Sequence, residues 1–183
     1  MIWIGLDPGN TGAMVALNER YNVVYAASFP LMNIGTSKTK RMMLDAVEFS
    51  CDLRNLLDRE GAQYVVLEKA QAMPGQGVSS MFQYGRGFGM LEMALAALRV
   101  PYELVHPTRW QKAVLKGVAG RDTKARAIAV CRHRLPDLDL TPGRKRKPDE
   151  GLADAACMAL YAMERRPLLT LVRVPPPPPT RPQ

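Results

Sequence analysis

The spacing of apolar and polar residues in the first third of the chain predicts strands followed by a helix. Apolar runs at residues 2–6, 13–17 and 23–29 are separated by short polar turns, which is typical of an antiparallel three-stranded meander. Residues 43–58 then carry apolar side chains at helical spacing, and Gly61 follows where a helix would end.

The rest of the chain alternates between the two patterns and then becomes helical. Short apolar runs at 64–67 and 102–105 predict two further strands, with a long apolar helix at 81–98 between them. Three more helical segments follow, at residues 108–115, 122–134 and 150–165. A meander followed by β-α-β units predicts an α/β fold, a mixed sheet with helices on its faces.

Length and composition set limits on the class of protein. The chain has 183 residues, of which 47% are hydrophobic, enough for one globular domain at 1–166. Residues 167–183 are rich in proline and are expected to be a disordered tail. No apolar run approaches the roughly 20 residues of a membrane span, and no targeting signal precedes the first strand, so we expect a cytoplasmic protein.

The three cysteines, Cys51, Cys131 and Cys157, are widely spaced and form no CxxC pair. This spacing argues against a disulfide framework and against a zinc site. We interpret all three as small buried residues.

Basic residues are concentrated in one segment. Residues 99–147 contain 13 basic and 4 acidic residues, whereas the whole chain has a net charge of +8. The remainder of the chain is therefore close to neutral. A basic segment beside a neutral one indicates a face that binds a polyanion such as nucleic acid, although a generally basic surface is the alternative.

Acidic residues lie where the predicted elements end or begin. Asp7 ends the first strand and Glu68 ends the fourth, so parallel neighbouring strands would bring both carboxylates to one edge of the sheet. Glu150 and Asp154 are four residues apart at the start of the last helix and share a face. Asp149 is an alternative to Glu150, and it could instead cap the helix.

Such a cluster of carboxylates is costly without cations, because each charge disfavours the ionisation of its neighbours. Mg²⁺ and Mn²⁺ prefer oxygen ligands and relieve this repulsion, and two such ions can assist phosphodiester hydrolysis. Each acid alone has a structural explanation: a turn residue, the start of a solvated loop, or an acid favoured by the helix dipole. It is their combined spacing that favours the functional interpretation.

Several motifs together resemble a known family. They are DPGNTG after the first strand, LEKAQAMPGQG after the fourth, HPTRWQKAV, the DTK of residues 122–124, and DEGLADAACMAL at the last helix. In this order they are similar to the RuvC-type Holliday junction resolvases of the ribonuclease H-like superfamily, above all to the phage-borne branch. The resemblance implies a five-stranded mixed sheet flanked by helices.

The resemblance also implies a catalytic role for particular residues. Asp7, Glu68 and Asp154 would be ligands of two Mg²⁺ ions, with Mn²⁺ as a substitute. The fourth metal ligand would be Glu150 or, alternatively, Asp149. The implied reaction is metal-dependent cleavage of a four-way DNA junction by paired symmetric nicks, leaving 5′-phosphate and 3′-hydroxyl ends.

Basic and apolar residues are assigned to DNA in the same way. Lys112 and Lys124 match lysines near the cleaved phosphate, although general contact with the DNA backbone is the alternative. Trp110 is expected to anchor its helix in the core, with base stacking as the alternative. The basic loop before the last helix would neutralise the DNA arms through Arg144, Lys145, Arg146 and Lys147. Candidates for separating bases at the junction centre, with core or dimer packing as the alternative, are Met73, Met81, Phe82 and Tyr84.

The helix from Met81 to Leu98 is apolar on more sides than a surface helix needs, and it contains Gly85, Gly87 and Gly89. Because a four-way junction is roughly two-fold symmetric, we predict a homodimer built on this helix, the glycines allowing close approach. Three other hypotheses about the function remain. They are an actin-like ATPase, which would need a second lobe, a small RuvC-like RNA-processing nuclease, and a non-catalytic DNA-binding module.

Overall fold

A mixed five-stranded sheet forms the centre of the computed structural model, which describes residues 1–9, 11–36, 38–60, 62–71, 75, 77–143 and 146–165. The strand order is β3-β2-β1-β6-β7. The strands are β1 (Ile2–Asp7), β2 (Ala13–Asn18), β3 (Val23–Ser28), β6 (Ala62–Glu68) and β7 (Tyr102–Val105). The first three form an antiparallel meander, and β6 and β7 are added in parallel beside β1. The predicted sheet is therefore confirmed.

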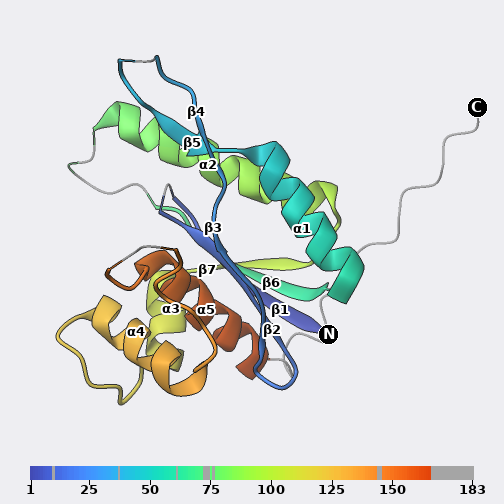
Figure 1. Cartoon of the computed structure of the whole chain (residues 1–183), viewed down its shortest axis with the longest axis vertical. Coiled ribbons are helices and arrows are strands. Elements are labelled where there is room, and N and C mark those ends of the chain that lie inside the picture. The colour runs from blue at the N-terminus through green and yellow to red at the C-terminus, as the bar shows by residue number, and fades with distance from the viewer. Residues whose placement is uncertain are drawn as a thin grey trace, which may run out of the picture.

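Helices cover both faces of this sheet (Figure 1). One face carries α1 (Ala46–Glu60) and α2 (Val78–Ala97). The other face carries α3 (Pro107–Val114), α4 (Thr123–Arg134) and α5 (Glu150–Glu164). Successive side chains of β1 point alternately into the hydrophobic cores on the two faces of the sheet. Trp3 packs on the α5 side, whereas Ile2 and Ile4 pack on the side of α1 and α2. The predicted layered α/β architecture follows from this alternation.

Helix α5 lies unusually close to the sheet. Gly5 in β1 makes this possible, because an added Cβ atom would lie 1.9 Å from the backbone oxygen of Ala155 and 2.6 Å from the backbone nitrogen of Ala159. Between Gly151 and Met163 every residue of α5 is buried except Asp154, which is partly exposed. The close packing of small residues thus fixes the position of one carboxylate beside the central strand.

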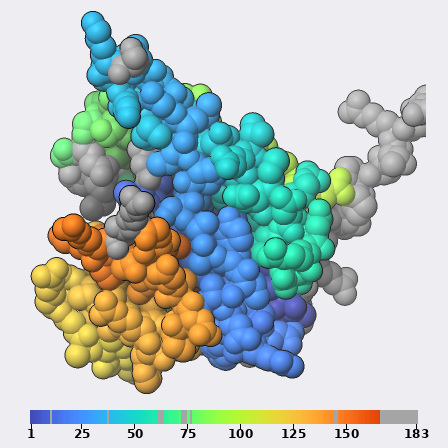
Figure 2. All heavy atoms as spheres, in the orientation of Figure 1, coloured from blue at the N-terminus to red at the C-terminus, as the bar shows by residue number. Residues whose placement is uncertain are grey.

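The structure corrects the first predicted helix. Strand β5 (Met42–Leu44), which forms a short hairpin with β4 (Leu31–Asn33), occupies the residues where this helix was expected to begin. Asp45 explains the boundary, because its Oδ1 accepts hydrogen bonds from the backbone N–H groups of Val47 and Glu48 and so starts α1 after the strand. The hairpin projects at one end of the molecule (Figure 2).

Other expectations are corrected or lie outside the described residues. Cys131 and Cys157 are buried as predicted, but Cys51 is exposed, because it lies on the outer face of α1. Helix α2 begins at Val78 rather than at Met81. The predicted sites at Met73, Arg144 and Lys145, and the predicted tail at 167–183, lie outside the described residues. Among those that are described, no helix is long and apolar enough to cross a membrane.

Candidate active site

The C-terminal edge of β1 and β6 brings two of the predicted acids together. These strands are parallel, and Leu6 pairs with Leu67, the residues directly before Asp7 and Glu68. The turn after Asp7 is formed by Gly9, whose φ of 126° suits glycine, and Gly12 donates a backbone hydrogen bond to the Gly9 oxygen. The DPG motif therefore ends the strand with its carboxylate at the sheet edge.

Asp154 on α5 joins this pair from the adjacent helix. Burial raises the pKa of Asp7 well above its usual range, and the charges of Asp154, Glu68 and Asp149 raise it further, while Lys124 opposes them. Burial, followed by the charge of Glu68, raises the pKa of Asp154 to about 7, with Glu150 contributing in the same direction. Each carboxyl is thus within the electrostatic reach of the others, in a place with little water.

The two candidates for the fourth position have different surroundings. Asp149 is the N-cap of α5: its Oδ1 accepts a hydrogen bond from the Leu152 N–H at 3.1 Å, and its Oδ2 accepts one from the Ser28 hydroxyl at 3.3 Å. Glu150 is exposed and forms an ion pair with Lys124. The capping role considered for Asp149 is therefore present, and both side chains lie beside the other acids.

Trp110 contacts the site in a way that the sequence interpretation missed. Its side chain is fully buried, as predicted for a core anchor, but its indole N–H also donates a hydrogen bond of 2.7 Å to Glu68 Oε2. Burial raises the pKa of Glu68, whereas this hydrogen bond and the nearby His106 lower it. A buried indole N–H needs an acceptor, which is the signal that could have linked Trp110 to an acid.

This contact predicts a measurable coupling between Trp110 and Glu68. A double-mutant cycle with Trp110→Phe and Glu68→Ala, followed by urea unfolding at pH 8, should give a coupling free energy of about 1.5–3 kcal/mol, the usual range for a hydrogen bond to a charged group. Phenylalanine fills most of the same space and removes the N–H donor. A coupling below about 0.5 kcal/mol would show that the hydrogen bond contributes nothing to folding.

The raised pKa values predict how stability depends on pH without divalent cations. Because the pKa of Asp154 is raised from 3.8 to about 7, the folded state binds more protons than the unfolded state between these values, and stability falls as pH rises through this window. We expect the free energy of unfolding in EDTA to be on the order of 2 kcal/mol lower at pH 8 than at pH 5. The Asp154→Asn variant should show a flatter profile, and an unchanged profile would contradict this electrostatic picture.

The basic residues predicted to contact DNA lie on the α3–α4 side and beside α5. Lys112 is exposed and lines a groove of about 390 Å³ between α3 and α4. Lys124 is exposed and pairs with Glu150, while Arg146 and Lys147 are exposed before α5. Arg126 has a different role, since its guanidinium donates to the backbone oxygens of Leu115 and Val118 and holds the connection between α3 and α4.

The donor set suits hard divalent cations, although it is not arranged as a finished metal site. All the gathered side-chain donors are carboxylate oxygens, the ligand type that Mg²⁺ and Mn²⁺ prefer. Among the residues that the structure describes, no three His, Cys, Asp or Glu side chains are placed to hold a metal ion. The acids therefore share one edge of the sheet, and side-chain rotation would have to bring them onto an ion.

Comparison with known structures identifies the fold. The chain is similar to RuvC of Thermus thermophilus in complex with a Holliday junction substrate, with a TM-score of 0.64 and 17% identity over 93% of this chain and 97% of that one. A second Thermus thermophilus RuvC structure gives a TM-score of 0.59 and 20% identity over 91% of this chain and 96% of that one. No family profile and no curated protein sequence matches the chain.

These likenesses show that the chain has a ribonuclease H-like fold, as predicted from its motifs. Within that class, its arrangement of strands and helices is similar to that of RuvC.

Proposed function

We propose that this protein is a structure-selective endonuclease that resolves four-way DNA junctions by paired, symmetric nicks. The observation that carries the proposal is the position of Asp7, Glu68 and Asp154, which meet at one edge of a sheet with the fold of RuvC. The solved RuvC with this fold is in complex with a Holliday junction substrate. The place of action expected for such an enzyme is DNA recombination and repair in a bacterial or phage-infected cell.

The proposed cofactor is a pair of Mg²⁺ ions, for which Mn²⁺ would substitute. Asp7, Glu68 and Asp154 would hold them together with Glu150, the acid that shares a face with Asp154. When bound, the ions would activate a water for in-line attack on a phosphodiester and stabilise the charge that develops. Burial raises the pKa values of Asp7 and Asp154, and repulsion from the neighbouring acids raises them further; bound cations would relieve this repulsion, which is the physical reason for such ions to bind here.

Other residues of the chain would orient this site and hold its substrate. Trp110 fixes the carboxylate of Glu68 through its N–H, and Asp149 fixes the first turn of α5. Lys124 pairs with Glu150 and would exchange this exposed ion pair for a phosphate oxygen when DNA binds. Lys112, Arg146 and Lys147 would contribute backbone contacts, which supply affinity and salt dependence rather than sequence specificity.

A homodimer through α2 belongs to this proposal. The outer face of α2 exposes Val78, Phe82 and Met93, with exposed fractions of 87%, 68% and 66%. Gly85 and Gly89 lie on the same helix, and no other part of the described chain would contact a Cβ atom added at either position. A second copy on this face would give two active sites related by a two-fold axis, as a symmetric junction requires. Sedimentation equilibrium measures this state directly.

The decisive experiment compares substrates. A synthetic four-way junction, a matched linear duplex and an RNA–DNA hybrid are each incubated with the protein and Mg²⁺ or Mn²⁺. Paired, symmetric nicks confined to the junction support a resolvase. Cleavage of the duplex or the hybrid at a comparable rate would instead indicate a general ribonuclease H-like nuclease, and junction binding without cleavage would indicate a DNA-binding module.

A further inference from the structure

The tip of the β4–β5 hairpin is basic. Residues 31–44 contain three basic residues, Lys38, Lys40 and Arg41, and no acidic residue. All three are exposed, and none forms an ion pair with a carboxylate in the described part of the chain. Asp45, the next acid along the chain, is engaged as the cap of α1. The tip therefore carries a positive charge that is available to an external partner.

The backbone of this tip is folded tightly on itself. Asn33 Oδ1 accepts hydrogen bonds from the backbone N–H groups of Gly35 and Arg41, each at 3.0 Å. The Ile34 N–H donates to the backbone oxygen of Arg41 at 2.8 Å. A Cβ atom added at Gly35 would lie 2.0 Å from the backbone oxygen of Thr39, so the two sides of the loop touch. These contacts use backbone groups and one amide, and the ordered backbone lowers the entropy cost of binding a partner through the basic side chains.

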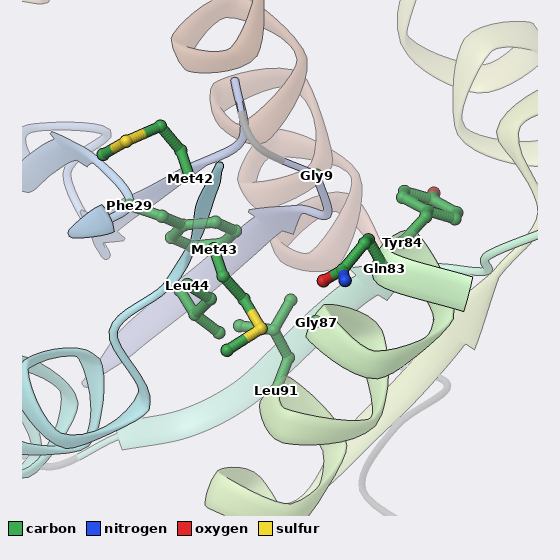
Figure 3. Close-up of a pocket in the computed structure, with 9 residues that line it drawn as sticks. All are labelled: Gly9, Phe29, Met42, Met43, Leu44, Gln83, Tyr84, Gly87 and Leu91. Carbon is green, nitrogen blue, oxygen red and sulfur yellow. The ribbon is translucent and has the colours of Figure 1, made fainter. Parts of the chain in front are cut away.

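The base of the hairpin packs against α2, close to the turn that follows Asp7. Met43 and Leu44 of β5 are buried. Both line a cavity of about 20 Å³ together with Leu91 of α2 and Gly9 (Figure 3). Gly9 lies two residues after Asp7. The packed base thus holds the basic tip beside the proposed catalytic acids.

A groove of about 440 Å³ runs between the hairpin and the first turns of α2. Lys40 and Arg41 line it on the hairpin side, and Ser79 and Ser80 line it on the helix side. Cationic side chains and hydroxyl groups are among the groups with which proteins contact the phosphates of DNA. The groove therefore suits a nucleic-acid backbone.

The hairpin and the basic surface of α3 and α4 lie on opposite faces of the sheet (Figure 1). Leu44 of β5 belongs to the core under α1 and α2, whereas Trp110 of α3 and Ala127 of α4 belong to the core on the other face. The proposed catalytic acids lie at the sheet edge between these faces. Because duplex DNA is stiff, with a persistence length of about 50 nm, a duplex along α3 and α4 would have to bend sharply to reach the hairpin as well. A four-way junction offers a second arm and can reach both surfaces.

We propose that the β4–β5 hairpin binds the phosphate backbone of a second arm of the junction, through Lys38, Lys40 and Arg41, while α3 and α4 hold another arm on the opposite side of the acids. This inference rests on the proposed function and deepens it, because it names the part of the substrate that distinguishes a junction from a duplex. A contact with the backbone is independent of the base sequence of that arm.

The first test compares binding of a four-way junction and of a matched duplex in EDTA, for the wild type and for the double variant Lys40→Ala with Arg41→Ala. At about 0.1 M salt we expect the variant to bind the junction about tenfold more weakly and the duplex less than about twofold more weakly. The slope of log K against log salt for the junction should fall by about two, since each contacted phosphate contributes about 0.9. The matched control is Arg20→Ala with Arg54→Ala, which removes the same charge from exposed positions in the β2–β3 turn and on α1 and should change neither affinity by more than about twofold.

The second test identifies the phosphates that the hairpin contacts. Methylphosphonates, which remove the charge of single phosphates, are placed in turn along each arm. At some positions they should weaken binding by the wild type about threefold, yet have no effect on the double variant of Lys40 and Arg41. These positions should lie in a different arm from those at which the substitution loses its effect in Lys112→Ala.

The outcomes separate this inference from the proposed function. Equal loss of junction and duplex affinity in the double variant, or methylphosphonate effects that persist in it, would overturn the inference. Unchanged junction binding with an altered sedimentation equilibrium would also overturn it and would assign the hairpin to contact with a second copy of the chain. If the wild type cleaves junctions selectively and the double variant binds them equally well, the inference fails and the proposed function stands. Junction binding that depends on the hairpin, without cleavage in Mg²⁺ or Mn²⁺, would instead overturn the nuclease function alone.

Discussion

Asp7→Asn is expected to lower the rate of junction cleavage by about 10³-fold or more, a loss of about 4 kcal/mol of transition-state stabilisation, while junction binding is retained. Asp7 is central to the acid cluster, since Glu68, Asp154 and Asp149 all act on its pKa. An amide in its place removes the negative charge that would hold a cation, and it keeps the size of the side chain. Single-turnover cleavage with Mg²⁺ and fluorescence anisotropy in EDTA measure the two quantities separately.

Stability separates a catalytic effect of Asp7→Asn from unfolding. Because ionised Asp7 is disfavoured by burial and by its neighbours, the variant should be at least as stable as the wild type at pH 8 without metal. Asp58→Asn is the matched control, as it removes the same charge from an exposed position on α1 and should leave cleavage unchanged. Retained cleavage in Asp7→Asn, or loss of junction binding, would contradict the assignment of Asp7 to the metal site.

The main features of the fold could be predicted because local patterns determine them. The apolar run before Asp7 and the DPG turn after it specify a strand that ends in a carboxylate. The spacing of Glu150 and Asp154 places both on one face of a helix, and the structure shows Glu150 acting on the pKa of Asp154. These relations span a few residues, so periodicity alone reveals them.

Features that depend on distant contacts could not be predicted in this way. The hydrogen bond from Trp110 to Glu68 joins residues 42 positions apart, and it exists only because the fold brings α3, packed against α5, to the end of β6. The β4–β5 hairpin was missed because Met43 and Leu44 fit a helical apolar pattern, and only the cap formed by Asp45 separates the strand from α1. The groove of about 440 Å³ between this hairpin and α2 depends on the same hairpin, so no local pattern indicates it.

Gly5→Ala is expected to destabilise the protein by more than about 3 kcal/mol, in the range of severe overpacking. The new methyl group would lie 1.9 Å from the backbone oxygen of Ala155, and backbone atoms cannot turn aside as a flexible side chain can. Either β1 bends or α5 moves away from the sheet, and both changes displace Asp154, the residue directly before Ala155, from Asp7. Urea unfolding followed by circular dichroism measures the loss of stability.

Gly85→Ala is the contrasting control for the Gly5 substitution. Gly85 lies in α2, and nothing in the described chain is within 4 Å of a Cβ atom added there. Measured on the monomer, at a protein concentration below dimer dissociation, the same change of residue should therefore be stabilising, by up to about 1 kcal/mol, because alanine favours a helix over glycine. If Gly5→Ala were as stable as the wild type, α5 would not be held against β1 by this contact. The position of Asp154 beside Asp7 would then need another explanation, whereas opposite effects of the two substitutions would tie the geometry of the site to the closeness of strand and helix.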